Sequence, residues 1–233
     1  MSSGRSAAAG EATSSPSARA PGARLDRSFY ARPSLVVAQE LLGKVLVHQV
    51  GTARTSGVIV EVEAYIGESD PACHAAPGPT RRNAPLYGDP GFAYVYLNYG
   101  IHCLMNVVTE GRGSPAAILI RALEPVDGVS LMRRRRARSA PGAPGLRGLP
   151  DVALCRGPGN LSRAMAITLR QNGLDLCGSR VYVEERDAWS GPVAWTSRIG
   201  IRVGTDRPWR AYVVESDAVS GRRATGHSPV SAS

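Results

Sequence analysis

The segment Val58–Tyr65, which reads VIVEVEAY, brings two carboxylates and a phenol into one short stretch. Its alternation of apolar and polar residues predicts a β-strand on which Glu61, Glu63 and Tyr65 share one face. Paired acids at this spacing suit general acid–base chemistry, although the same pattern is common on solvated sheet surfaces. The strand alone leaves both interpretations open. His74, which the following loop delivers, favours the catalytic one.

A second group of candidate residues is the tyrosine-rich run YVYLNYG at 94–100. Tyr94 and Tyr96 fall on one face of a predicted strand, and Tyr99 precedes Gly100 at a predicted tight turn between strands. Such tyrosines can simply pack in a core with paired hydroxyls. In a protein that acts on nucleic acid, they would instead form a stacking surface and an intercalating wedge.

A third candidate is the run Gly157-Pro158-Gly159, which follows Arg156 and opens a predicted helix. The unpaired N–H groups at a helix N-terminus suit a phosphate. The chain contains no G-x-G-x-x-G or Walker motif, so we expect no nucleotide cofactor. The zinc-deaminase signature is also absent, and neither Cys73-His74 nor His102-Cys103 has standard metal-ligand spacing, so we expect no metal.

The elements that must position these residues are predominantly strands, and the helices do not alternate with them. This pattern predicts an α+β fold, a single domain with a mostly antiparallel, curved sheet and surrounding helices. A long polar loop is expected over 67–91. Helices are predicted at 34–42, from Asp127 through Met132, and at 158–168, and strands at 44–50, 55–65, 92–97, 101–109, 116–123, 180–184, 193–201 and 210–214.

The charge of the chain is strongly positive, with 28 basic and 19 acidic residues and a net charge of +9. Such a balance favours an anionic partner, nucleic acid first. The segment 133–147 holds six arginines and no acid. Because prolines and glycines follow, a flexible basic loop is predicted over 133–150, either a solvated linker or a phosphate-contacting segment. Segments 1–24 and 217–233 are predicted to be disordered tails around a domain at 25–216.

Other classes of protein are disfavoured by composition. The chain has 233 residues, 43% of them hydrophobic, which is enough for a packed core. No apolar run is long enough for a membrane span, and there is no signal-peptide pattern. The four cysteines are widely spaced, which indicates reduced thiols. We therefore expect a cytoplasmic protein without a membrane partner.

Several ordered blocks of the sequence resemble the alkyladenine (3-methyladenine) DNA glycosylase family. The likeness extends from about Leu41 to Val214 and covers most of the chain, which makes it far more specific than any single block. It is carried by LLGKVLV (41–47), VEVEAYIGESDPACHA (60–75), PGFAYVYLNYGIHCLMNVV (90–108), AAILIRALEPVDGVSLMRRRR (116–136), LCRGPGNLSRAMAI (154–167) and SRIGI (197–201).

The resemblance implies a role for individual residues. Glu63 matches the general base that activates a water, and Arg121 matches an arginine beside it. Tyr99 matches the tyrosine that fills the gap left by a flipped nucleotide. Asn106 matches the residue that excludes guanine through its exocyclic amino group. The residues that match the base pocket are Tyr65, His74, Tyr96, Leu104 and Ile201.

The implied activity is that of a monofunctional DNA glycosylase in base excision repair. It would flip alkylated or deaminated purines out of duplex DNA, 3-methyladenine and 7-methylguanine first, with hypoxanthine and ethenoadenine as further candidates. No cofactor is implied. We expect a monomer in the bacterial cytoplasm that associates with the nucleoid during repair. The residues expected to contact the DNA backbone are Arg133, Arg134, Arg135, Arg136, Arg156, Gly157 and Gly159.

Two alternatives remain at this level. A non-catalytic nucleic-acid-binding domain on the same scaffold would keep the basic residues and the tyrosines, but it would not need Glu63, His74 and Asn106. A regulator that binds nucleic acid unspecifically through its arginines would explain only the charge.

Overall fold

The long strand β2 (Ala53–Ile66) lies at the centre of the fold, and the other strands are arranged around it. Its first half pairs with β1 (Val45–Val50) and its second half with β8 (Arg210–Val213). Along its other edge, β2 pairs with β5 (Ala116–Pro125). The fold is that of a computed structural model, which describes residues 22–138, 148–186 and 189–221.

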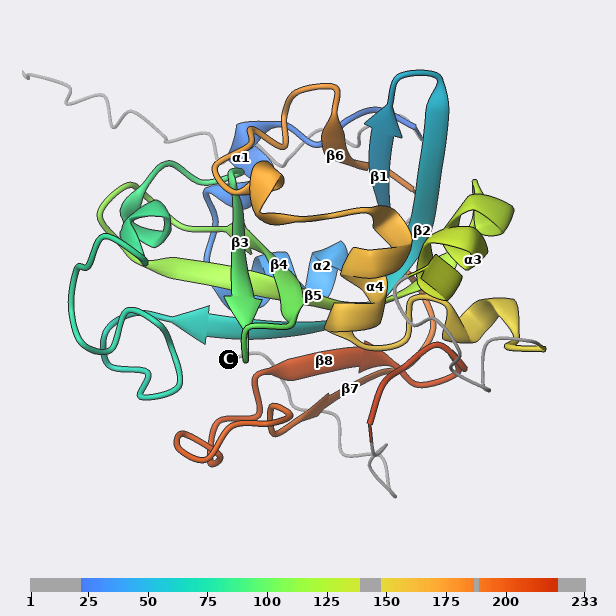
Figure 1. Ribbon diagram of the computed structural model, residues 1–233. Coiled ribbons are helices and arrows are strands. Elements are labelled where there is room, and N and C mark those ends of the chain that lie inside the picture. The colour runs from blue at the N-terminus through green and yellow to red at the C-terminus, as the bar shows by residue number, and fades with distance from the viewer. Residues whose placement is uncertain (1–21, 139–147, 187–188, 222–233) are drawn as a thin grey trace, which may run out of the picture.

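The remaining strands extend this sheet on both sides, as Figure 1 shows. The order across the sheet is β3-β4-β5-β2-β1-β6, with β7 added to β8, and every pairing is antiparallel. The predicted α+β fold with a curved antiparallel sheet is confirmed. The added strands are β3 (Ala93–Asn98), β4 (His102–Val108), β6 (Val181–Glu184) and β7 (Val193–Thr196).

Strand β2 bends sharply along its length (Figure 1), and the bend coincides with an irregular pairing between β2 and β5. The register passes from Ile59 to Glu61 and then to Val62, so Val60 on β2 and Arg121 on β5 have no partner in it. Bulges of this kind bend a strand and re-aim side chains, and they are frequent next to active sites. Here the irregular segment holds Glu61 and Arg121.

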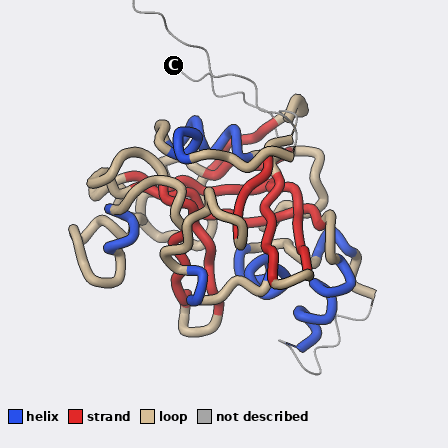
Figure 2. The backbone as a smooth tube through the Cα atoms, turned by 90° about the horizontal axis from the view of Figure 1, so that it is seen from above, coloured by secondary structure: helices blue, strands red, loops and turns tan. Residues whose placement is uncertain are grey.

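The helices lie at the periphery of the sheet, as Figure 2 shows from above. Helix α2 (Ser34–Leu41) buries Ser34, Val37, Ala38 and Leu41, the spacing expected when one helical stripe faces the core. Asp26 caps the short helix α1 (Arg27–Tyr30) by accepting from the backbone N–H of Phe29. The other helices are α3 (Val129–Arg138) and α4 (Pro158–Met165), with 3-10 turns at Ala84–Tyr87, Asp151–Ala153 and Leu169–Gln171.

The predicted basic loop is partly wrong, because its first arginines lie on helix α3 rather than in a loop. The helix continues to Arg138. Arg135 donates to the carbonyl of Ala164 at 3.0 Å, and Arg136 donates to the carbonyl of Leu154. These contacts fix the arginines at 133–138, which we call the arginine run, against the domain. Of the rest of the predicted loop, residues 139–147 lie outside the described residues.

The predicted tail boundaries are also corrected where the structure describes them. Residues 22–24 are anchored next to β6, with Gly22 donating to Glu185 and Arg24 bridging to Glu184. At the other end, Ala218 and Val219 are buried, so the domain extends at least to residue 221. The remainder of each predicted tail, 1–21 and 222–233, lies outside the described residues.

Smaller differences concern the ends of elements and the cysteines. The predicted strand 193–201 ends at Thr196, and the predicted helix 158–168 ends at Met165, because Ala166 adopts a left-handed conformation with φ 57°. All four cysteines are free thiols. Within the described ranges, no helix has both the length and the apolar composition that crossing a bilayer requires.

Candidate active site

An open cleft with a volume of about 510 Å³ lies where β2, the β3–β4 hairpin and helix α4 meet. That volume falls within the usual range of ligand sites, ~300–1,000 Å³. A narrower chamber of about 30 Å³ adjoins it and shares Tyr65, Ala72, His74 and Tyr96 with it. The chamber has room for water but not for a purine. A ligand of purine size would therefore be held by the cleft.

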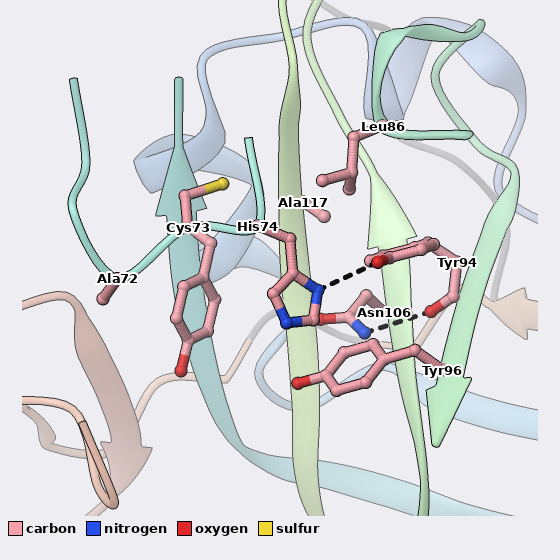
Figure 3. A pocket seen from close by; sticks show the side chains of 9 residues that line it. Ala72, Cys73, His74, Leu86, Tyr94, Tyr96, Asn106 and Ala117 are labelled. Carbon is pink, nitrogen blue, oxygen red and sulfur yellow. Dashed lines mark hydrogen bonds between the residues drawn. The ribbon is translucent and has the colours of Figure 1, made fainter. Parts of the chain in front are cut away.

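Side chains from β2, β3, β4, β5 and the segment between β2 and β3 line the chamber (Figure 3). The His74 Nδ1 atom and the Tyr94 hydroxyl share a hydrogen bond of 2.9 Å. The His74 ring also lies edge-on to Tyr96, with centroids 4.4 Å apart. Asn106 donates through its amide to the Tyr94 carbonyl at 3.0 Å, which fixes its orientation. The chamber therefore has a rigid aromatic wall, and the amide of Asn106 faces that wall.

Burial keeps the titratable groups of this wall in their neutral forms. It raises the pKa of Tyr94 to about 12. Burial, and next the charge of Glu63, raise the pKa of Tyr65 well above its usual value. Burial, and next the charge of Arg82, lower the pKa of His74 below its usual value of 6.5. At neutral pH the wall thus presents uncharged rings and hydroxyl donors.

Glu63 lies beneath the cleft with 0% exposure. Its Oε1 atom accepts from the backbone N–H of Ile199 at 2.7 Å, and its Oε2 atom accepts from the Tyr65 hydroxyl at 2.9 Å. The Arg121 Nη1 atom lies 3.2 Å from Oε2. All three partners line the cleft. A carboxylate has about four acceptor positions, so these contacts leave one on Oε1 for a further donor.

Glu61 is the second carboxylate of the strand and is also fully buried. Its Oε1 atom accepts from Arg121 Nε at 3.1 Å and from Arg210 Nε at 2.7 Å, and its Oε2 atom accepts from the backbone N–H of Ser220 at 2.7 Å. Burial acts to lower the pKa of Arg121, but Glu63 and Glu61 outweigh it and the pKa is raised. We call Glu61, Glu63, Arg121 and Arg210 the buried charge cluster.

A separate ion pair holds the loop that presents Ile199. Arg198 and Asp70 are both buried and paired through two contacts of 2.5 and 2.8 Å. The Arg198 guanidinium also lies 4.6 Å from the centre of the Tyr65 ring. This pair ties the loop after β7 to the loop after β2. It thereby fixes the amide that binds Glu63.

The tip of the β3–β4 hairpin projects Tyr99, which is 85% exposed. Tyr99 has φ 49° and Gly100 has φ 70°. A left-handed conformation is costly for a residue with a bulky side chain and cost-free for glycine. The hairpin therefore holds an aromatic ring in solvent on a strained backbone, next to the cleft that Tyr99 helps to line.

The N-terminus of helix α4 forms the opposite side of the cleft, which Gly157, Pro158, Gly159 and Asn160 line. A Cβ atom at Gly159 would lie 3.0 Å from the His102 ring, so the close approach of helix and hairpin favours glycine there. The helix directs its unpaired N–H groups and partial positive charge toward this side. No cluster of three or more potential metal ligands occurs among the described residues.

Comparisons with known proteins identify relatives of this chain. The family model of methylpurine-DNA glycosylases matches residues 28–217. A relative from Chlorobium phaeobacteroides is 47% identical over 203 residues, covering 86% of this chain and 97% of its own. A relative from Methanocella arvoryzae is 48% identical over 206 residues, covering 87% and 98%. Each carries the provisional name 3-methyladenine DNA glycosylase.

The chain belongs to the methylpurine-DNA glycosylase family. Members of this family are DNA glycosylases, hydrolases of the N-glycosidic bond that act in DNA repair. The family membership confirms the resemblance that the sequence blocks indicated. The DNA partner follows from the family, whereas the lesions removed and the oligomeric state do not.

The structure brings most of the predicted site residues of this glycosylase together. Tyr65, His74 and Tyr96 line both cavities, and Asn106 lines only the inner chamber. Glu63 lies directly beneath the cleft. The predicted residues that line only the cleft are Tyr99, Leu104, Arg121, Gly157, Gly159 and Ile201. Their catalytic and binding roles remain predictions.

The predicted backbone contacts are more scattered. Arg133 binds Asp151 and the Leu149 carbonyl, and Arg156, which is exposed, donates to the Asp217 carbonyl. Arg135 and Arg136 also bind carbonyl groups of the domain. Arg134 is exposed. The arginine run is therefore not the free basic segment that the sequence predicted.

Sequence reasoning missed several residues that contact the site. Glu63 accepts from the amide of Ile199, whose loop the Arg198–Asp70 pair holds. Glu61 accepts from Arg210 and Ser220. Arg210 carried a usable signal, because a buried strand RAYV that begins with a charge implies a buried partner. Ser220 carried none, since it lies in a segment predicted to be disordered.

Proposed function

We propose that this glycosylase removes alkylated purines from duplex DNA by hydrolysis with a water activated by Glu63. The observation that carries the proposal is the setting of Glu63, buried beneath the cleft and held by three donors that leave one acceptor position on Oε1. A water that donates to this position would be aligned toward the sugar of a nucleotide in the cleft. General bases of this kind typically contribute ~10²–10⁴-fold to the rate.

The chemistry of the bond agrees with this arrangement. A glycosidic bond inside the base stack is inaccessible, so the nucleotide must leave the helix, at a cost of about a few kcal/mol. Tyr99 would fill the gap in the duplex and offset the lost stacking. An oxocarbenium-like sugar would then be stabilised by the negative charge of Glu63.

The lesions proposed first are 3-methyladenine and 7-methylguanine. Both carry a positive charge on the purine, which makes them good leaving groups and good partners for the rings of Tyr65, His74 and Tyr96, with cation–π contacts of ~0.5–2 kcal/mol. The fixed amide of Asn106 would disfavour the exocyclic amino group of guanine, and the weaker glycosidic bond of the charged 7-methylguanine would offset that cost. Hypoxanthine and ethenoadenine are neutral and lack this attraction, so we expect slower removal of both.

The proposed reaction is hydrolysis without strand cleavage. A lyase needs an amine nucleophile at the sugar, and Lys44 is the single lysine of the chain. Its ammonium group pairs with Glu185, and it lines neither cavity. We propose that Arg134 and the N-terminus of α4 at Gly157 and Gly159 contact the DNA backbone, and that the protein acts as a monomer.

The test is single-turnover excision from duplexes that each carry one lesion, with hot alkali to cut the resulting abasic sites. Wild type should excise 7-methylguanine quickly and hypoxanthine and ethenoadenine more slowly, always with alkali-dependent cleavage. Glu63→Gln should bind lesion DNA normally and lose about 10²–10⁴-fold in excision rate.

Glu61→Gln is the matched control, because it changes a second buried carboxylate on the same strand that also binds Arg121. We expect a smaller loss than for Glu63→Gln. A larger loss in Glu61→Gln would reassign the base to Glu61. Tight DNA binding without excision of any lesion by wild type would instead favour a non-catalytic binding domain on this scaffold.

A further inference from the structure

A second pocket, with a volume of about 370 Å³, lies on the other side of the β3–β4 hairpin from the cleft. His102 and Leu104 of the hairpin line the cleft, whereas Ile101 and Cys103 line this second pocket. The division follows from the alternation of side chains along β4. The hairpin that carries Tyr99 is thus a wall between two cavities.

Three of the described arginines line the second pocket, which we call the arginine pocket. Arg135 and Arg138 come from helix α3, and Arg163 comes from helix α4, which packs against α3 (Figure 1). None of the described residues that line the pocket is acidic. Within the part of the chain that the structure describes, Arg138 and Arg163 form no ion pair, and Arg135 donates to the neutral oxygens of Ala164 and Thr55.

Arg138 and Arg163 therefore place positive charge in a partly closed space without a counter-ion among the described residues. Burial, and next the neighbouring charge of Arg134, lower the pKa of Arg135 below its usual value. Like charges gathered in this way repel one another, and an anion bound among them would reverse that cost. The pocket therefore favours an anionic ligand on electrostatic grounds.

Ser162 adds an independent observation. It lines the pocket and is 1% exposed, and its hydroxyl has no hydrogen-bond partner among the described residues. A buried hydroxyl without a partner costs ~1–3 kcal/mol. Such groups are rare, and a ligand that accepts a hydrogen bond would remove the cost. Arginine donors together with a hydroxyl donor suit a phosphate group.

We propose that the arginine pocket binds a backbone phosphate of the DNA, on the side of the Tyr99 wedge that faces away from the cleft. The inference rests on the proposed function, because that function makes duplex DNA the source of the phosphate. Ile101, which lines the pocket, is 65% exposed beside Tyr99 at the hairpin tip. If Tyr99 enters the duplex, the DNA backbone on one side of the wedge would reach the cleft, and the DNA backbone on the other side would reach the arginine pocket.

The first experiment measures binding of undamaged duplex DNA over a range of salt concentrations. Each phosphate contact contributes about −0.9 to the slope of log affinity against log salt. We expect the double variant Arg138→Gln/Arg163→Gln to make the slope shallower by about 0.9 and to weaken binding about tenfold or more at low salt. Ser162→Ala should weaken binding a few-fold without altering the slope.

The matched control is Arg112→Gln. Arg112 is an exposed arginine beyond the far end of β4, paired with Asp89 and absent from both cavities. The variant should keep wild-type slope and affinity. An equal change in Arg112→Gln would show that only net charge matters. An unchanged slope in a folded double variant, checked by its thermal midpoint, would likewise overturn the proposal.

The second experiment replaces single phosphates along each strand by neutral methylphosphonates. Wild type should lose affinity at one or two adjacent positions, and the double variant should show no loss there. If inorganic phosphate binds in the pocket but no methylphosphonate substitution lowers the affinity for DNA, the pocket binds a free anion and the assignment to DNA is wrong. Neither experiment requires excision, so failure of the proposed reaction would leave these results interpretable.

Discussion

The arginines of the buried charge cluster and those of the arginine pocket are contrasting uses of the same side chain. Arg121 and Arg210 are almost fully buried, and Glu61 and Glu63 balance their charge. Arg138 and Arg163 line a partly closed pocket to which no acidic residue of the described ranges contributes. The first pair is satisfied within the fold. The second pair is available to a ligand.

This difference indicates that the two sides of the β3–β4 hairpin serve different functions. Balanced charges under the cleft hold a carboxylate in one geometry, which a reaction step requires. Unbalanced charges beyond the hairpin can bind a polyanion without sequence preference. Substitutions should therefore affect stability and excision on one side and DNA affinity on the other.

The largest expected effect on stability comes from a buried pair on the cleft side. Arg198→Met removes the main cation of the fully buried Asp70 and leaves it only the longer contact with Arg207, at 3.9 Å. Removal of one partner of a buried ion pair costs ~3–5 kcal/mol. Arg138→Gln, at an exposed position, should change the free energy of unfolding by less than about 0.5 kcal/mol. Urea titrations of both variants measure the difference, and similar losses in the two would contradict the comparison.

The next effect concerns the segment after β8, which holds the charge cluster from outside the sheet. Ser220 donates its N–H to Glu61, accepts from Arg210 through its carbonyl at 2.7 Å, and accepts from Arg121 through its hydroxyl at 3.2 Å. Hydrogen bonds to charged groups contribute ~1.5–3 kcal/mol each. Deletion of 217–233 should therefore lower the single-turnover excision rate about 10–100-fold.

Deletion of only 222–233 is the control for this truncation, because it keeps all three bonds of Ser220. It should leave the excision rate unchanged. Ser220→Ala, which removes only the hydroxyl, should lower the rate a few-fold without changing affinity for lesion DNA. Equal rates in the two truncated proteins would show that the segment does not position Arg121.

Local patterns predicted the sheet well and the charge cluster only in part. The period-2 alternation along Val58–Tyr65 placed Glu61 and Glu63 on one face, and the structure has them there, sharing Arg121. Their other partners are too distant in sequence for any local signal. Arg210 lies 149 residues from Glu61, and Ser220 lies 159 residues from it. Such contacts depend on the tertiary fold.

The arginine run illustrates the opposite failure, in which a local signal was overruled. Pro141 and Gly142 indicated a break, and the prediction placed it too early, at Arg133. Arginine is a good helix former, and α3 is held against the domain by contacts from Arg135 and Arg136 to carbonyls of Ala164 and Leu154. Tertiary hydrogen bonds thus extend a helix that the sequence pattern alone would have ended.

The smallest expected effect compares a histidine of the inner chamber with a histidine of β1 that contacts α4. His74 lines the inner chamber, and His48 shares a hydrogen bond of 2.7 Å with the Met165 carbonyl of α4. Burial is the main cause that lowers both pKa values below 6.5. The charge of Arg82 adds to the effect at His74. At His48 the Met165 contact opposes it, while Arg135 and Arg180 add to it.

The sign of the resulting pH dependence follows from these directions. A histidine with a lowered pKa in the folded state stays neutral there while the unfolded chain already takes up a proton. Stability should therefore be highest above pH 6.5 and fall as the pH drops from that value toward the folded-state pKa. His74→Gln and His48→Gln should each flatten the fall of the thermal midpoint between neutral and mildly acidic pH. Arg135→Gln should flatten it only through His48, so combination with His48→Gln should add nothing, whereas combination with His74→Gln should be additive. A fall in midpoint that none of these variants alters would mean that other groups control the acid stability of the protein.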